Sequence, residues 1–155
     1  MSRMPRKELI DESEVGIYHC VQRAVRRAFL CGQDPFTGKN FDYRKTWIRE
    51  RMEFLAGQFG LDVLGFAVMS NHLHVIVRNR PDLVATWTDE EVARRWLAVY
   101  PSRKNVHGEA EEPTAEDVRM ITSDPERLAE LRKRLSSISW FMRNIAEPIA
   151  RRANK

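Results

Sequence analysis

Two histidines separated by one residue form the pattern in this sequence with the clearest chemical meaning. They are His72 and His74, and they belong to the apolar run HLHVIVR at residues 72–78. Because side chains alternate along a strand, both imidazoles would project from one face while Leu73 points to the other. Such a pair suits a divalent metal ion, and two protein ligands would leave positions open for catalysis. Alternatively, both histidines lie on a solvated sheet face, bonded to neighbours. His19, on another predicted strand, could line the same face or be structural.

Arginines flank the predicted strands and indicate a ligand that carries phosphate. Arg23, Arg26 and Arg27 follow the first predicted strand, and Arg78 and Arg80 end the histidine strand. Guanidinium groups neutralise the phosphates of nucleic acids and release their counterions, which favours binding. On charge alone, the basic segments could bind nucleic acid or form a solvated surface, and these arginines are the candidates for phosphate contacts.

The elements that must position these side chains can be predicted from apolar spacing. Residues 15–22 and 61–69 predict strands, which join the strand at 72–78. A helix is predicted over residues 44–59, because apolar residues recur there every three or four positions: Ile48, Met52, Leu55 and Phe59. The order strand–helix–strand–strand–helix predicts an α+β fold, a ferredoxin-like sandwich that lacks its last strand. Its antiparallel sheet would have helices on one face, and the other face would be free for a ligand.

A linker and one helix are predicted after the histidine strand. Pro81 is expected to close the sheet unit. Thr88 and Glu91 form a capping box at the start of a helix that stops near Tyr100. Trp87 lies near the basic end of the histidine strand, where it could stack on a nucleobase or pack in the core.

The last third of the chain predicts a polar insert followed by a long helix. Residues 101–124 are polar and acidic, with one short helix near residues 115–121. Asp124 and Pro125 suit the start of a long amphipathic helix, which Pro148 should kink or end. The apolar stripe of this helix could serve the core of the chain or a homodimer; it comprises Leu128, Leu131, Leu135 and Ile138.

Composition indicates one globular domain. The chain has 155 residues, 43% of them hydrophobic and 31% charged, which is enough to bury a core. The net charge of +4 is uneven, because residues 1–80 and 126–155 are basic while residues 81–125 are acidic. No apolar run approaches the roughly 20 residues of a membrane helix, and the N-terminus does not resemble a signal peptide. Cys20 and Cys31 are too few for a disulfide framework, so we expect a reducing cytoplasm.

Three segments resemble one protein family, in the order in which that family has them. MSNHLHVIV at residues 69–77 resembles the signature of IS200-like transposases, the single-tyrosine members of the HUH endonuclease group. It looks particularly like the branch associated with repetitive extragenic palindromes. GIYHCVQR at residues 16–23 resembles the first strand of that family, and SWFMR at residues 139–143 resembles the start of its tyrosine-bearing helix. The resemblance covers about residues 14–80 and 135–155.

The resemblance implies an HUH endonuclease fold and a metal-dependent reaction on DNA. In the family the two histidines hold Mg²⁺ or Mn²⁺ at the scissile phosphate of single-stranded DNA, so His72 and His74 would be ligands. Asn154 matches the polar residue that assists the metal. A tyrosine attacks the phosphate and stays linked to it, which leads to strand transfer in DNA transposition and recombination of mobile elements. The partners implied for the domain at residues 1–155 are single-stranded or hairpin DNA and a second copy in a homodimer.

The sequence departs from the family pattern where the nucleophile belongs. No tyrosine follows Tyr100, and the equivalent stretch EPIAR at residues 147–151 offers no hydroxyl group. We therefore expect no covalent DNA adduct at the usual position. Related proteins continue beyond the position of Lys155, which predicts a missing C-terminal continuation. Three functions stay open: a metal-dependent nickase-transposase, a non-catalytic DNA-binding module on the same fold, and an unrelated ferredoxin-like binder of metal or RNA.

Overall fold

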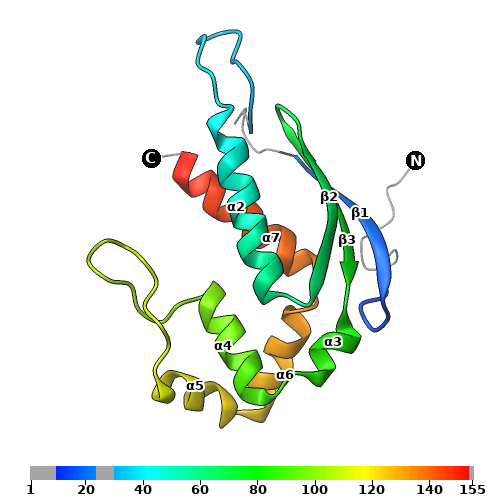
Figure 1. Cartoon of the computed structure of the whole chain (residues 1–155), viewed down its shortest axis with the longest axis vertical. Helices are drawn as coiled ribbons and strands as arrows, with labels where there is room; N and C mark the ends of the chain where they lie inside the picture. The colour runs from blue at the N-terminus through cyan, green and yellow to red at the C-terminus, as the bar shows by residue number, and fades with distance from the viewer. Residues whose placement is uncertain (1–9, 24–29, 154–155) are drawn as a thin grey trace.

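The computed structural model describes residues 10–23 and 30–153, which contain three strands and six helices (Figure 1). The strands are β1 (Gly16–Arg23), β2 (Leu61–Val68) and β3 (His72–Asn79). They form one sheet in the order β1-β3-β2, and β3 runs antiparallel to both neighbours. The predicted α+β class and antiparallel sheet are therefore confirmed.

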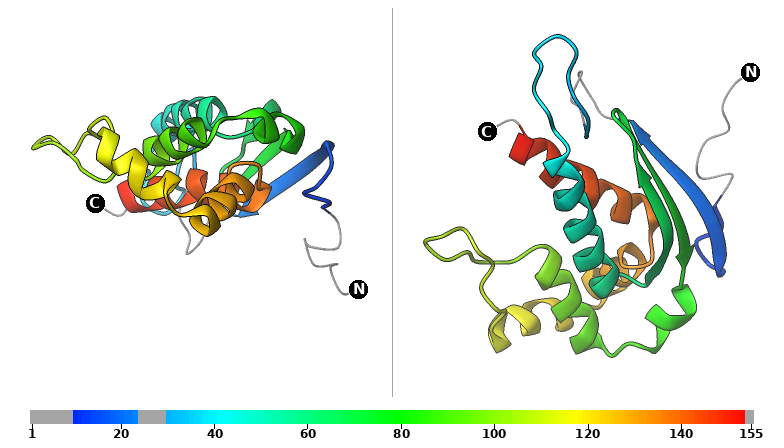
Figure 2. Two further views of the ribbon diagram at one scale, coloured as in Figure 1. Left: turned by 90° about the horizontal axis from the view of Figure 1, so that it is seen from below. Right: turned by 45° about the horizontal axis from the view of Figure 1, so that its top comes forward.

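Helices α2 (Tyr43–Gln58) and α7 (Ile138–Ala153) lie on the same side of the sheet (Figures 1 and 2). The β3 side chains that point toward them, Leu73, Val75 and Val77, are buried. The β3 side chains that alternate with these point to the opposite face, which no described helix covers. The sheet therefore has one apolar face in the core and one face open to a ligand, and His72 and His74 lie on the open face.

The remaining helices form a second group below the sheet, and α4 contacts α2, α5 and α6. Their bounds are α3 (Pro81–Thr86), α4 (Asp89–Val99), α5 (Ala115–Thr122) and α6 (Pro125–Arg134). The predicted end of the sheet unit at Pro81 is confirmed, because β3 ends at Asn79, but this proline also begins the short helix α3, which was not predicted. A proline is tolerated at the first helical position, where its missing N–H has no partner in the helix.

The single long helix predicted from Asp124 is wrong, because it divides into α6 and α7. The turn between them contains Ser136 and Ser137, whose hydroxyls compete for backbone hydrogen bonds. The Ser136 hydroxyl donates to the Lys133 carbonyl, and the Ser137 hydroxyl accepts from the Trp140 N–H at 3.4 Å. The predicted apolar stripe is buried on both sides of this turn: Leu128, Leu131, Leu135 and Ile138.

Pro148 was predicted to kink or end the helix, and the second of these effects is wrong, because α7 continues through Pro148 to Ala153. A proline inside a helix leaves the carbonyl four residues earlier without its N–H donor. That carbonyl belongs to Asn144, and it accepts a hydrogen bond from Nε of Arg51 on α2 at 2.9 Å. The Arg51 side chain therefore supplies the missing donor and joins the two helices.

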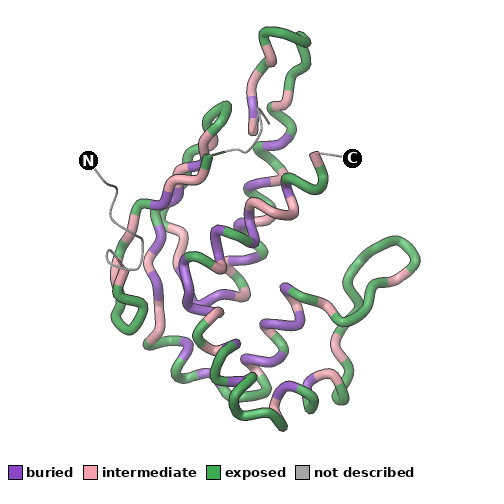
Figure 3. The backbone as a smooth tube through the Cα atoms, turned by 180° about the vertical axis from the view of Figure 1, so that it is seen from behind, coloured by how far each residue is buried: buried purple, intermediate pink, exposed green. Residues whose placement is uncertain are grey.

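Buried residues follow the inner sides of β3, α2 and α7 and continue into the lower helices (Figure 3). At the junction, the Phe59 and Phe141 rings meet edge to face with centroids 5.6 Å apart. One continuous core thus joins the sheet to both groups of helices. Among the described residues, no helix is both long and apolar enough to cross a membrane.

Candidate nucleic-acid and metal site

Three histidines gather on the open face of the sheet, and we call them, together with Arg23, the histidine face. His72 and His74 project from β3, with ring centroids 6.2 Å apart. The antiparallel register places His19 of β1 diagonally beside His74. Nε2 of His19 lies 3.0 Å from Nδ1 of His74, and the two rings stack at 5.2 Å. The prediction that His72 and His74 lie on one face of the sheet is confirmed, and His19 lies on the same face.

Two hydrogen bonds indicate the tautomer of His72. Its Nδ1 lies 2.6 Å from Oδ1 of Asn71, an atom that can only accept, so Nδ1 carries the proton. Its Nε2 lies 3.2 Å from Nε of Arg23, a group that can only donate, so Nε2 has the lone pair. Both contacts require the same neutral tautomer.

One contact of His72 is typical of a histidine that binds a divalent metal ion. A metal-ligating histidine typically donates through its second ring nitrogen to a neighbouring acceptor, as His72 does to Asn71. The guanidinium of Arg23 occupies the lone pair that a metal ion would need, so the two cations compete for His72. The described residues contain no group of three or more His, Cys, Asp or Glu side chains placed to hold a metal. Asn154, the third predicted ligand, lies outside the described residues.

The arginines predicted to bind nucleic acid have different surroundings. Arg23 is exposed and contacts His72. Arg78 pairs with Asp62 at 2.7 Å, and Arg80 pairs with Asp82 at 3.0 Å. The hydrogen bonds to Asp82 raise the pKa of Arg80 further above its ordinary value. A phosphate at these two arginines would have to displace carboxylates. Arg26 and Arg27 lie outside the described residues.

The three tyrosines of the chain lie away from the histidine face. Tyr18 alternates with His19 on β1 and therefore points to the opposite side of the sheet. Tyr43 packs edge to face against Trp47, and Tyr100 stacks on Trp96 at 4.6 Å. These ring contacts place both residues in the helical layer. No tyrosine is therefore positioned beside His72 and His74.

A groove of about 480 Å³ lies between β1 and α7, next to the histidine face. Gln22 and Arg23 line it from β1, and Glu147 and Ala150 line it from α7. The side-chain oxygen of Gln22 is buried and has no hydrogen-bond partner among the described residues. Residues 147–151 correspond to the stretch that carries the tyrosine in the family that the sequence resembles. Helix α7 thus places this stretch across a groove from Arg23, and it presents no hydroxyl group.

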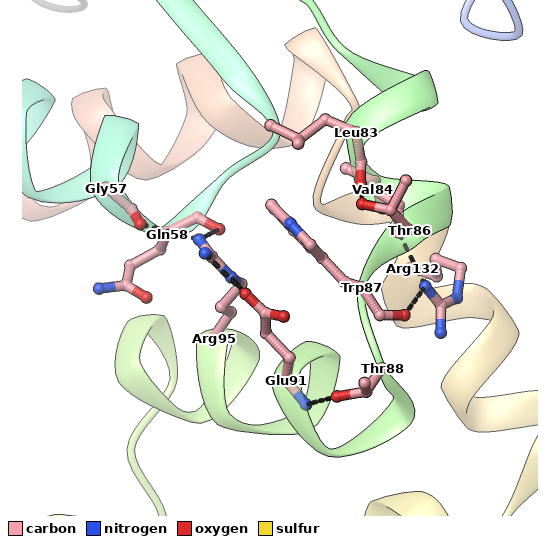
Figure 4. Close-up of polar contacts among 10 residues, drawn as sticks. All are labelled: Gly57, Gln58, Leu83, Val84, Thr86, Trp87, Thr88, Glu91, Arg95 and Arg132. Atoms are coloured by element: carbon pink, nitrogen blue, oxygen red, sulfur yellow. Dashed lines mark hydrogen bonds and ion pairs between the residues drawn. The ribbon is translucent and has the colours of Figure 1, made fainter.

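Trp87 belongs to the core and cannot stack on a nucleobase (Figure 4). The residue is only 8% exposed, and the guanidinium of Arg95 lies over its ring, 3.9 Å from the ring centroid. Arg95 also donates to the carbonyls of Gly57 and Gln58, which ties α4 to the end of α2. On the other side, Arg132 donates to the Val84 and Trp87 carbonyls, both at 2.8 Å. Of its two predicted roles, core packing is the correct one.

Asn71 is the site residue whose role could not be assigned from the sequence. Its only signal is its position directly before the first histidine, in the turn between β2 and β3. The importance of that position depends on a side-chain contact that spacing does not reveal.

No family model, curated protein or solved structure matches the chain.

Proposed function

We propose that the histidine face binds a phosphodiester of single-stranded or hairpin DNA, in the manner of the IS200-like transposases that the sequence resembles. The observation that carries this proposal is the ordered group of three histidines and Arg23 on a sheet face that no described helix covers. An open face accommodates an extended strand, and the cation of Arg23 attracts its phosphates. Phosphodiester cleavage and strand transfer in DNA transposition is the activity proposed for the site.

The sheet topology supports the same proposal. Strands β1 and β2 are both antiparallel to β3, so they run parallel to each other with β3 between them. Helix α2 connects them across the buried face. This order is the one that a split βαβ unit of a ferredoxin-like sandwich would have without its fourth strand. We therefore assign the chain to that fold type, with HUH endonuclease geometry, as part of the proposal.

In this function, His72 and His74 would hold the metal, for which Mg²⁺ or Mn²⁺ is proposed. When bound, the ion supplies positive charge that neutralises a phosphate in the transition state. Asn71 keeps the proton of His72 on Nδ1, so the lone pair of Nε2 faces outward. In the free protein, Arg23 donates a hydrogen bond to that lone pair. When Arg23 releases His72, its guanidinium is placed to contact a phosphate.

A second candidate function is DNA binding without cleavage. It is favoured by the positions of Tyr18, Tyr43 and Tyr100, none of which belongs to the histidine face. A tyrosine nucleophile must approach the phosphorus to about 3–3.5 Å. On this alternative, the chain is a degenerate or domesticated relative of a transposase that retains recognition.

The binding step is tested with the full chain and a fluorescently labelled hairpin oligonucleotide. Anisotropy should show binding that weakens steeply with salt and is lost in a His72→Ala/His74→Ala variant. Titration calorimetry with Mn²⁺ should show binding to the wild type and none to that variant. His107→Ala changes an exposed histidine on a distant loop and is the matched control. If the wild type and the double variant bind DNA and Mn²⁺ with equal affinity, the proposal is wrong.

The cleavage step is tested by incubating end-labelled hairpin DNA with the protein and Mn²⁺ and running a denaturing gel. Free nicked product supports hydrolysis at the histidine face, with water as the nucleophile. A band shifted by the mass of the protein would show that one of the three tyrosines attacks. DNA that stays intact while it binds supports the non-catalytic alternative.

A further inference from the structure

A loop at residues 31–42 protrudes from the molecule and presents a nearly fully exposed aromatic ring. The loop connects the segment after β1 to the start of α2 and extends beyond the helices (Figures 1 and 3). Phe36 stands in its turn and is 95% exposed. The ring contributes nothing to the core, so the stability of the fold does not explain a phenylalanine at this position.

Local hydrogen bonds fix the turn that presents Phe36. The Asp34 carboxylate accepts from the Phe36 N–H at 2.9 Å and from the Thr37 hydroxyl at 2.7 Å. These bonds lower the pKa of Asp34, the hydroxyl contributing most, so its charge persists at neutral pH. Gly38 has a φ of +73°, which glycine adopts without strain, and its N–H donates to the Asp34 carbonyl. The ring is therefore held on an ordered turn before any ligand arrives.

The base of the loop is attached to the turn that carries the histidine site. The Leu30 N–H donates to the Ser70 carbonyl at 2.7 Å, and Ser70 directly precedes Asn71 and His72 in the chain. Phe36 lies six residues beyond Leu30, a distance of at most about 20 Å for extended chain. A strand of a few nucleotides could therefore contact the histidine face and Phe36 together.

We infer that Phe36 stacks on an unpaired base of the DNA strand whose phosphate lies at the histidine face; this inference rests on the proposed function. The surroundings of the ring favour a base as its partner. Phe36 follows Pro35 in the turn, and Asp34, Thr37 and Lys39 surround the pair, so the apolar surface at the tip is one aromatic ring beside one proline. A stable protein interface needs about 800 Å² from each partner, whereas stacking on a base needs only one aromatic face. Lys39 supplies a positive charge for the adjacent backbone.

The test uses a hairpin oligonucleotide with 2-aminopurine, a fluorescent base analogue, at each unpaired position in turn. Binding of wild-type protein should quench the fluorescence at one of these positions. Phe36→Ala should abolish the quenching and weaken the affinity about 5- to 150-fold, whereas Phe36→Trp should retain both. Val106→Ala is the matched control, because Val106 is 96% exposed at the tip of the other protruding loop. It should bind and quench as the wild type does.

The outcomes separate this inference from the proposed function. If Phe36→Ala binds and quenches like wild type while His72→Ala/His74→Ala loses binding, the stacking inference is wrong and the proposed function stands. If wild-type protein binds no hairpin DNA at low salt, both are wrong. Phe36-dependent binding to vesicles of phosphatidylcholine and phosphatidylserine, with unchanged DNA binding, would assign the ring to a lipid surface and overturn the inference. Thermal unfolding of each variant verifies that the fold is intact.

Discussion

At the scale of single residues, Asn71 determines which nitrogen of His72 is available. Replacement of Asn71 by alanine removes the acceptor at 2.6 Å that holds the proton on Nδ1. We expect the affinity for Mn²⁺ to fall about 10- to 100-fold, the usual effect of losing such a partner. Calorimetry measures the affinity, and ¹⁵N NMR of the imidazole measures the tautomer. Ser70→Ala, one residue earlier in the same turn, is the control. An unchanged affinity of Asn71→Ala for Mn²⁺ would contradict this role.

Arg23 should affect metal and DNA in opposite directions. In Arg23→Gln the guanidinium no longer competes for Nε2 of His72, so Mn²⁺ should bind more tightly. The same change removes a phosphate contact, so DNA should bind more weakly and the slope of log affinity against log salt should fall by about 0.7–0.9. Calorimetry and salt-dependent anisotropy measure the two effects. Arg78→Gln is the comparison, because Asp62 already pairs with Arg78, and its slope should change little. Weaker binding of both ligands to Arg23→Gln would rule out the competition.

At the scale of secondary-structure elements, the Arg51 side chain compensates for the proline inside α7. In Arg51→Met the carbonyl of the buried Asn144 loses its donor, which should lower the free energy of unfolding by about 1–3 kcal/mol. In a Pro148→Ala background the helix supplies its own N–H to that carbonyl, so the same replacement should cost less. Urea unfolding of the two single variants and the double variant measures this coupling. Additive effects would show that the two residues act independently.

Sequence spacing predicted the elements better than their contacts. Period-two alternation placed His72 and His74 on one face correctly, because that face is set within a single strand. The contact of His19 with His74 depends on the register between β1 and β3, which no local pattern encodes. The turn at Ser136 and Ser137 was missed because the apolar stripe continues across it. Spacing within one element likewise could not reveal the Arg51 donor on another helix.

At the scale of the whole molecule, the two basic segments of the sequence meet in space, while residues 101–124 of the acidic segment lie apart. Strand β1 with Arg23 and helix α7 line one groove, although they are more than a hundred residues apart in the chain. Residues 101–124 form a separate loop and α5 at the other end of the fold (Figure 1). In the acidic segment, Arg103 donates to Asp117 and pairs with Glu111, which neutralises part of its charge internally. In the proposed function, a DNA strand at the histidine face would lie away from the acidic residues of this loop and α5.

The apolar stripe of α6 and α7 belongs to the core of the chain, so a homodimer would have to use another surface. Leu131, in the middle of that stripe, is 0% exposed. We expect Leu131→Ala to lower the free energy of unfolding by about 2–5 kcal/mol, because truncation leaves a cavity. The unfolding midpoints of wild type and variant should not depend on protein concentration, whereas a dimer held together by this stripe would make the wild-type midpoint rise with concentration. Urea unfolding at several concentrations, with light scattering on the same samples, distinguishes the two. A variant that is as stable as the wild type but has a different molecular mass in solution would show that the stripe forms a dimer interface.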